Sequence, residues 1–232
     1  MKIKFYAHAS FRLETDDLAI VTDPYTPAPG NSGFDRIDEE ADIVLMSSAT
    51  DSFHSDPSHV KGNPIVVNTL ALPSEGKNID GKIFVKSYPG WESMTFDYRA
   101  EFARDPDANA LYHFELGGLR FLHMGDIGNP IVKEHMDALA GKVDVLLALA
   151  GAHATIALDD LDTFIEHVKP KVVIPMHYYS PKGVLKIEPV ESFLKHCKPE
   201  NVTRVKGSTL ELTPAMLPKT NTPHVYVLEQ SR

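Results

Sequence analysis

Two apolar runs in the second half of this 232-residue chain constrain its fold more than any other feature. Residues 143–150 and 171–176 consist mainly of apolar side chains, a composition typical of β-strands that are covered on both faces. Between the two runs, apolar residues recur at helical spacing from Leu158 to Val168, which predicts an amphipathic helix. Buried strands next to amphipathic helices indicate an α/β domain.

Shorter strand-like runs fall into two blocks. The first block reads as a β-meander and contains residues 2–6, 11–14, 19–22 and 43–47. The second contains residues 65–68, 82–87, 110–116 and 120–124, with a hairpin turn at Gly117-Gly118. Further helices are expected over residues 131–139 and 189–197, and a closing hairpin over 202–206 and 209–212. Two β blocks, each with helices over its outer face, predict a four-layer α/β/β/α sandwich.

Two segments show no periodicity. Residues 26–40 are rich in proline and glycine, so we expect a surface loop there. Residues 214–232 include Pro214, Pro218 and Pro223 and are expected to form an extended C-terminal arm, which could pack between the subunits of a homo-oligomer. The sequence therefore predicts one domain over residues 1–213, followed by this arm.

The charge and composition of the chain exclude several functions. Thirty-two acidic side chains stand against 23 basic ones, and the basic residues form no stripe that could follow a phosphate backbone. No apolar run approaches the roughly 20 residues that a bilayer requires, and the first residues lack the apolar core of a signal peptide. We therefore expect a cytoplasmic protein that has no nucleic-acid or membrane partner and acts on, or binds, a small molecule. The single cysteine, Cys197, can form neither an internal disulfide nor a thiolate zinc site alone.

Polar residues follow the apolar runs at the points where the strands should end. They are His8, Asp23, residues 47–51, His123, Asp126, His153 and His177. Strand ends in sheets of this type converge on one edge, where ligands commonly bind. The sequence therefore predicts a polar site at that edge.

Five short motifs give the chain a family resemblance. They are Tyr6-Ala-His-Ala-Ser-Phe11, Val21-Thr-Asp-Pro24, Ala41-Asp-Ile-Val-Leu-Met-Ser47, His123-Met-Gly-Asp126 and Ile174-Pro-Met-His-Tyr178. In order and separation they resemble the metallo-β-lactamase superfamily, and within it the lactonase-like branch of metal-dependent hydrolases. The resemblance implies the α/β/β/α fold and a centre of two metal ions that activates water.

The resemblance also shows where this chain departs from the family. The family's His-x-His-x-Asp-His loop corresponds here to positions occupied by Ser48, Thr50, Ser52 and Phe53, none of which is a usual zinc ligand. A further family histidine has no counterpart, because residues 60–112 contain no histidine. By resemblance, Asp126 and His177 remain as two of seven ligand positions, so a two-metal centre is not expected.

Neighbouring residues could rebuild a smaller site. Asp51 and His54 stand three positions apart beside the altered loop and could join Asp126 and His177 in holding one divalent ion, zinc or manganese. We take Asp126 and His177 as the catalytic candidates, and these two with His54 as the metal candidates. His8, Asp23, Asp51 and His123 are candidates for lining the same pocket, and Glu92 is a more distant one.

Three functions remain open at this point. The first is hydrolysis of a small lactone, ester, amide or phosphoester through a single metal ion. The second is a metal-free pseudoenzyme or binding module that keeps the fold and the pocket. The third is acid–base hydrolysis without metal, with His177 and Asp126 as the reacting pair. In the last two cases, Asp126 would need His177 or backbone N–H groups to offset its burial.

Overall fold

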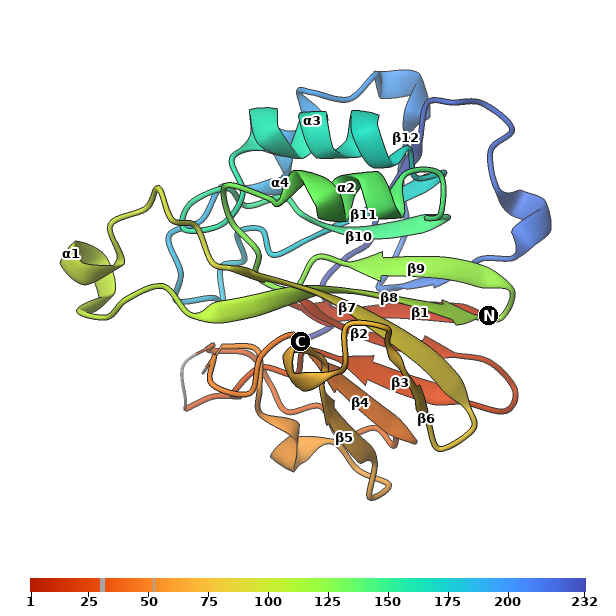
Figure 1. The fold of residues 1–232 in the computed structure, drawn as a ribbon, viewed down its shortest axis with the longest axis horizontal. Helices are drawn as coiled ribbons and strands as arrows, with labels where there is room; N and C mark the ends of the chain where they lie inside the picture. The colour runs from red at the N-terminus through yellow and green to blue at the C-terminus, as the bar shows by residue number, and fades with distance from the viewer. Residues whose placement is uncertain (30–31, 52) are drawn as a thin grey trace.

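The computed structural model describes residues 1–29, 32–51 and 53–232. Two β-sheets lie face to face, and α-helices cover the outer face of one of them (Figure 1). The six-stranded sheet has the order β13-β1-β2-β3-β4-β5, and the eight-stranded sheet has the order β12-β14-β11-β10-β9-β8-β7-β6. The predicted α/β sandwich is confirmed.

The six-stranded sheet begins with the predicted meander. Its strands are β1 (Lys2–Ala7), β2 (Ser10–Glu14), β3 (Ala19–Thr22), β4 (Ile43–Met46), β5 (Ile65–Asn68) and β13 (Thr209–Glu211). Strands β1, β2 and β3 are antiparallel, whereas β4 and β5 continue the sheet in parallel from β3. Residues 65–68, predicted to lie in the second β block, therefore belong to the first sheet.

The eight-stranded sheet has an antiparallel half and a parallel half. Its strands are β6 (Lys77–Ile79), β7 (Ile83–Trp91), β8 (Ala108–Leu116), β9 (Leu119–His123), β10 (Val145–Leu149), β11 (Val172–Met176), β12 (Val202–Arg204) and β14 (His224–Val227). The hairpin at Gly117-Gly118 is confirmed by the pairing of Leu116 with Leu119. Strands β9, β10, β11 and β14 run parallel. Strands β10 and β11 are buried along their whole length, as their apolar runs predicted.

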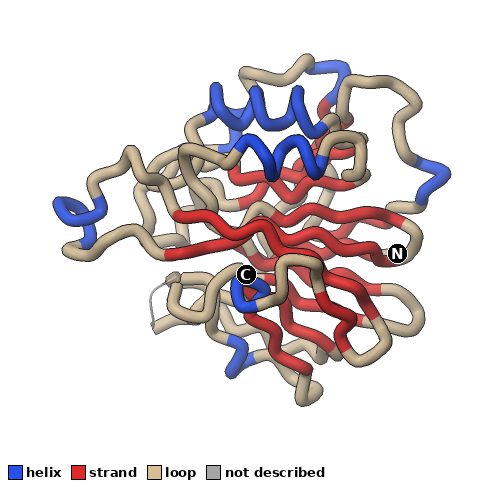
Figure 2. The backbone as a smooth tube through the Cα atoms, viewed as in Figure 1, coloured by secondary structure: helices blue, strands red, loops and turns tan. Residues whose placement is uncertain are grey.

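The helices are short. They are α1 (Tyr98–Phe102), α2 (Lys133–Leu139), α3 (Leu158–Val168) and α4 (Val190–Leu194), with 3-10 turns η1 (Pro57–His59), η2 (Thr69–Ala71), η3 (Pro199–Asn201) and η4 (Pro214–Met216). Helices α2 and α3 lie together on the outer face of the eight-stranded sheet (Figure 2). None of the helices in the described part of the chain has the length and apolar character that a membrane-spanning helix needs.

The outer face of the six-stranded sheet has a different cover. Tyr25, Phe34 and Ile37 are buried against Val44 and Met46 of β4, so the described residues 24–29 and 32–41 form this layer. We predicted a surface loop here and a helix over the sheet. The aromatic and branched side chains of the segment instead bury enough apolar surface to hold irregular backbone against the strands.

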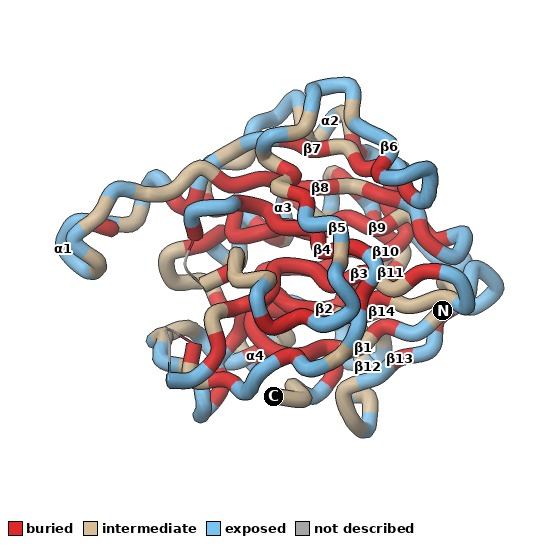
Figure 3. The backbone as a smooth tube through the Cα atoms, turned by 90° about the horizontal axis from the view of Figure 1, so that it is seen from below, coloured by how far each residue is buried: buried red, intermediate tan, exposed pale blue. Residues whose placement is uncertain are grey.

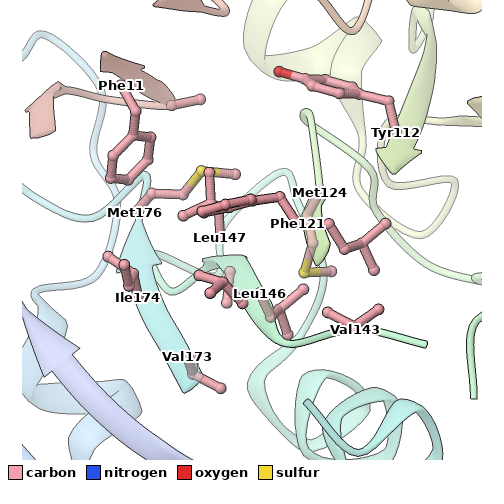
Figure 4. Packing of buried hydrophobic residues seen from close by; sticks show 14 of the residues in the cluster. Phe11, Tyr112, Phe121, Met124, Val143, Leu146, Leu147, Val173, Ile174 and Met176 are labelled. Atoms are coloured by element: carbon pink, nitrogen blue, oxygen red, sulfur yellow. The ribbon is translucent and has the colours of Figure 1, made fainter. Parts of the chain in front are cut away.

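The core lies between the two sheets. Figure 4 shows Phe11 of β2 meeting Met176 of β11 in the same apolar layer. Buried backbone runs through the middle of both sheets, and exposed residues concentrate in the turns and in α1 (Figure 3). Full burial of each large apolar side chain contributes about 1.5–3 kcal/mol, so this layer rigidly positions the loops that leave the strand ends.

The predicted closing hairpin is wrong. Strand β12 lies in the eight-stranded sheet and β13 in the six-stranded one, so the chain crosses from one sheet to the other between them. Val205 donates its N–H to Val227, and Ser208 accepts from Phe5 of β1. The two strands have separate partners because both sheet edges offer backbone groups that need hydrogen bonds.

The predicted C-terminal arm is also wrong. Residues 224–227 form β14, which inserts between β11 and β12, with Val225 and Val227 buried. The N–H of Ser231 then donates to Tyr6 of β1 at 2.8 Å. The three prolines lie outside β14 and leave its ladder intact. The described chain therefore forms one domain that includes residues 214–232.

Candidate metal centre

Five buried side chains gather where four strands end. His8 follows β1, Asp51 and His54 lie in the loop after β4, Asp126 follows β9, and His177 follows β11. The exposed fraction of each is 8% or less. The predicted convergence of strand ends thus brings together both catalytic candidates, all three metal candidates, and two of the four pocket candidates.

The distances between these side chains are short. His54 Nε2 lies 3.4 Å from Asp126 Oδ2 and 3.9 Å from Asp51 Oδ2, and His177 Nε2 lies 3.5 Å from Asp126 Oδ1. The centre of the His8 ring is 4.5 Å from the centre of the His54 ring and 4.2 Å from the centre of the His177 ring. Two overlapping groups of possible ligand atoms result, each within 4.8 Å: one from the three histidines, the other from Asp51, His54 and Asp126. His54 belongs to both groups.

Many polar atoms in this cluster have no hydrogen-bond partner. They include both ring nitrogens of His8, His54 and His177, Oδ2 of Asp51 and Oδ1 of Asp126. Buried polar atoms are normally paired, and each unpaired one costs about 1–3 kcal/mol. Separations of 3.4 to 3.9 Å are long for a hydrogen bond. Two ligands about 2.1 Å from one tetrahedral zinc ion would lie roughly 3.4 Å apart, so the cluster fits a divalent cation.

The charges of the cluster also favour a bound cation. Burial lowers the pKa of His54, but the carboxylates of Asp51 and Asp126 outweigh burial and raise this pKa to about 10. Burial raises the pKa of Asp51 and lowers those of His8 and His177, the latter to about 4. A proton on His54 therefore balances the two carboxylates, a role that a bound cation would take over.

The loop after β4 brings Asp51 and His54 to the cluster through hydrogen bonds of its own. Ser48 Oγ bonds to Thr50 Oγ1 at 3.1 Å, and Thr50 is exposed. Asp51 Oδ1 accepts the N–H of Phe53 at 2.9 Å, which leaves Oδ2 for the centre, and His54 donates its N–H to Asp51 O at 3.2 Å. This turn brings Asp51 and His54 inward. Ser52, one of the altered family positions, lies outside the described residues.

Tight backbone geometry fixes the ligands. His8 and His177 have positive φ angles of 58° and 50°, and the N–H of His177 donates to His8 O at 2.7 Å. Non-glycine residues rarely adopt this conformation, and they concentrate at functional sites. Gly125 has a φ of 58°, and a Cβ there would lie 2.5 Å from Ala110 O. Glycine at this position lets the turn bring Asp126 against the cluster.

Asp23 and His123 form a separate buried pair behind the centre. His123 Nδ1 accepts the N–H of Gly125 at 2.9 Å, and Nε2 donates to Ala9 O at 2.8 Å. Asp23 Oδ1 accepts the N–H of Ser47 at 2.6 Å, and burial raises the Asp23 pKa to about 7. Asp23 and His123 were expected to line the pocket, but neither is among its described lining residues, and both ring nitrogens of His123 have backbone partners. The pair instead holds the turns after β1, β4 and β9.

A pocket opens onto the cluster. Besides His54, Glu92, Asp126 and His177, its lining includes Phe53, Tyr98, Phe102, Arg104, His153, Ala154, Thr155 and Leu185. Glu92, a distant candidate from the sequence, is buried here and paired with Arg104. Sequence reasoning missed Tyr98, Phe102 and Arg104. They lie in a stretch without periodicity, where a glutamate, an arginine and several aromatic residues were the only signal.

Comparison with known proteins places this chain in a family. The sequence profile of the β-lactamase superfamily domain matches residues 2–177. The chain therefore belongs to the β-lactamase superfamily. No comparison bears on the lactonase-like branch, which stays a prediction.

Individual relatives agree with this assignment. A UPF0173 metal-dependent hydrolase from Carboxydothermus hydrogenoformans is 28% identical over 197 residues, covering 77% of this chain and 84% of the relative. A UPF0173 protein from Pyrococcus furiosus is 30% identical over 188 residues, covering 77% and 83%. A crystal structure from Thermotoga maritima, described as a Zn-dependent hydrolase of the metallo-β-lactamase superfamily, shares 29% identity and covers 99% of both chains, with a TM-score of 0.72.

Proposed function

We propose that this protein is a metal-dependent hydrolase of small molecules, with one divalent cation held by His54, His177 and Asp126 and completed by His8. The observation that carries the proposal is the convergence of buried, unpartnered nitrogen and oxygen atoms from these side chains. The relatives named as metal-dependent hydrolases support the same chemistry.

The bound cation would polarise the substrate and lower the pKa of a water molecule toward about 7. The chain's own side chains divide the remaining tasks. Asp126 lies between His54 and His177, with one oxygen near Nε2 of each ring, and would share the cation with both. Asp51 Oδ2 is buried, unpartnered and 3.9 Å from His54 Nε2, so it is the acceptor for a proton released from water. The aromatic wall of the pocket excludes bulk water from the reacting bond.

The metal-free binding module is not favoured. The loss of family ligands at Ser48 and Thr50 is compensated by Asp51 and His54, which the turn brings to the same cavity as Asp126 and His177. Metal-free acid–base catalysis has less support still, because burial holds the pKa of His177 at about 4.

The test is metal content and chelator-sensitive hydrolysis in tag-free protein. We expect about one zinc or manganese ion per chain by mass spectrometry, and ester, lactone or phosphoester hydrolysis that a chelator abolishes and the ion restores. His54→Ala and His177→Ala should lose the ion, whereas the matched control His167→Ala, on the surface of α3, should keep it. Unchanged metal content in both centre variants, or hydrolysis that resists the chelator, would refute the proposal.

A further inference from the structure

The pocket wall is a projecting segment that is pinned at its base. Strand β7 ends at Trp91, which pairs with Ala108 of β8, and the chain between them carries α1 away from both sheets (Figure 1). The hydroxyl of Tyr98 donates to Ala154 O, and the Phe96 ring packs against His153 with centres 4.8 Å apart. The segment is therefore fixed to the loop after β10 and forms one side of the pocket.

The positive charge in this wall is Arg104, which is paired with a buried carboxylate. Arg104 donates two bonds to Glu92, at 2.6 and 2.9 Å, and a third to Asp105 O at 2.9 Å. Its guanidinium carbon lies 4.8 Å from the centre of the Tyr98 ring. Glu92 is buried and also accepts the N–H of Asp107 at 2.7 Å. The Arg104 fork is thus directed at Glu92, and the two charges balance each other.

The other charges near the reacting bond disfavour an anion. Asp126 and Glu92 line the pocket, and Asp51 lies directly behind His54. Among the described lining residues, Arg104 is the only lysine or arginine. An anionic group on the side of the substrate away from the metal would lie beside the balanced Glu92–Arg104 pair, with no unpaired lysine or arginine among the described lining residues to offset its desolvation. Phe53, Phe102 and Leu185 give the pocket an apolar surface, beside the rings of Tyr98 and His153.

From this arrangement we infer that the substrate is uncharged and places an aromatic or branched apolar group against Phe53, Tyr98 and Phe102. The inference rests on the proposed hydrolase function and deepens it by naming the substrate class. Phosphate, sulfate and carboxylate groups beside the reacting bond are selected against.

The first test compares phenyl acetate with 4-acetoxybenzenesulfonate on the metal-loaded enzyme. The two esters have the same ring, and the sulfonated one has the better leaving group, so intrinsic reactivity opposes the expected order. We expect kcat/KM to be at least about tenfold higher for phenyl acetate, the range in which apolar contacts discriminate. Faster chelator-sensitive turnover of the sulfonated ester would overturn the inference while leaving the hydrolase proposal intact.

Two variants locate the effect in the wall. Phe102→Ala should lower kcat/KM for phenyl acetate about tenfold more than for methyl acetate, since the smaller ester does not reach the wall. Glu92→Gln should free the guanidinium and narrow the preference against the sulfonated ester. Equal losses for both acetates in Phe102→Ala would overturn the inference.

A binding measurement separates the two proposals. Acetanilide and 4-acetamidobenzenesulfonate can be compared by saturation-transfer NMR on metal-loaded protein, without turnover. We expect a signal for acetanilide that Phe102→Ala weakens, and a much smaller one for the sulfonate. Acetanilide binding with no hydrolysis of any ester would defeat the hydrolase proposal alone, whereas stronger binding of the sulfonate would defeat the substrate class.

Discussion

Two buried histidine–aspartate pairs in this molecule have almost the same geometry and different consequences. His123 Nδ1 lies 3.4 Å from Asp23 Oδ2, and His54 Nε2 lies 3.4 Å from Asp126 Oδ2. Both ring nitrogens of His123 have backbone partners, whereas neither nitrogen of His54 has one. A short distance between imidazole and carboxylate therefore does not identify a ligand. What distinguishes the two histidines is whether their remaining polar atoms are satisfied.

The largest expected effect is at the unsatisfied pair. Asp126→Asn should lower zinc affinity by about 100-fold or more, since it removes a ligand charge and disturbs the orientation of His54 and His177. Chelator-sensitive hydrolysis should be lost with it. Zinc titration against a chromophoric chelator measures the affinity, and circular dichroism checks that the variant folds. A folded variant with unchanged affinity would show that the two pairs are equivalent.

The pair of His123 and Asp23 should respond in stability instead. His123→Ala leaves the N–H of Gly125 without its partner and opens a cavity beneath the turn, so the free energy of unfolding should fall by about 3 kcal/mol. Denaturant titration provides this number. Zinc bound per folded chain should stay at the wild-type value, and its loss would place His123 in the centre after all.

The pH dependence of metal binding sharpens the comparison further. The pKa of His54 is raised from 6.5 to about 10, so between these values the metal-free folded protein holds a proton that the unfolded chain has released. The stability that this proton contributes is complete below pH 6.5 and is lost as pH rises through about 10. Because a cation must displace the proton, zinc affinity should rise about tenfold per pH unit in this window. An affinity that does not change between pH 6.5 and 8.5 would contradict this role of His54.

The smallest effect should come from Asp23. Its pKa is raised by burial to about 7, so stability is greatest below its ordinary pKa and decreases as pH rises through about 7. Asp23→Asn keeps an oxygen for the N–H of Ser47 and cannot ionise. We therefore expect the variant to equal the wild type near pH 4 and to gain about 1 kcal/mol relative to it by pH 8. Thermal unfolding at both pH values measures this difference, and a gain at pH 4 instead would reverse the assignment.

Local sequence patterns predicted much of the fold. Helix α3 occupies the predicted residues 158–168, and the hairpin at Gly117-Gly118 is where the glycine pair indicated. Both depend on neighbours in sequence. The assignment of residues 209–211 and 224–227 to their sheets depends on distant edges that offer free backbone groups, and no local periodicity reports them.

Some residues of the candidate site could likewise be placed from local sequence patterns, and others could not. The places of Asp126 and His177 follow from strand ends, which the apolar runs mark clearly. Hydrogen bonds inside one turn direct Asp51 and His54 toward the cluster, while Ser48 and Thr50 bond to each other. The sequence does not show these bonds, so it could name Asp51 and His54 only as possible replacements. Arg104 and Tyr98 join the pocket through a projection whose position is set by contacts with the loop after β10.

The backbone hydrogen bond from His177 to His8 joins the two sheets beside the candidate centre, and this placement has a mechanical consequence. His8 and His54 extend from the six-stranded sheet, whereas Asp126 and His177 extend from the eight-stranded one. An ion shared among these four side chains would cross-link the six-stranded and eight-stranded sheets at one edge. Metal loading should then slow hydrogen exchange along β1 and β11 together, although the two strands lie in different sheets.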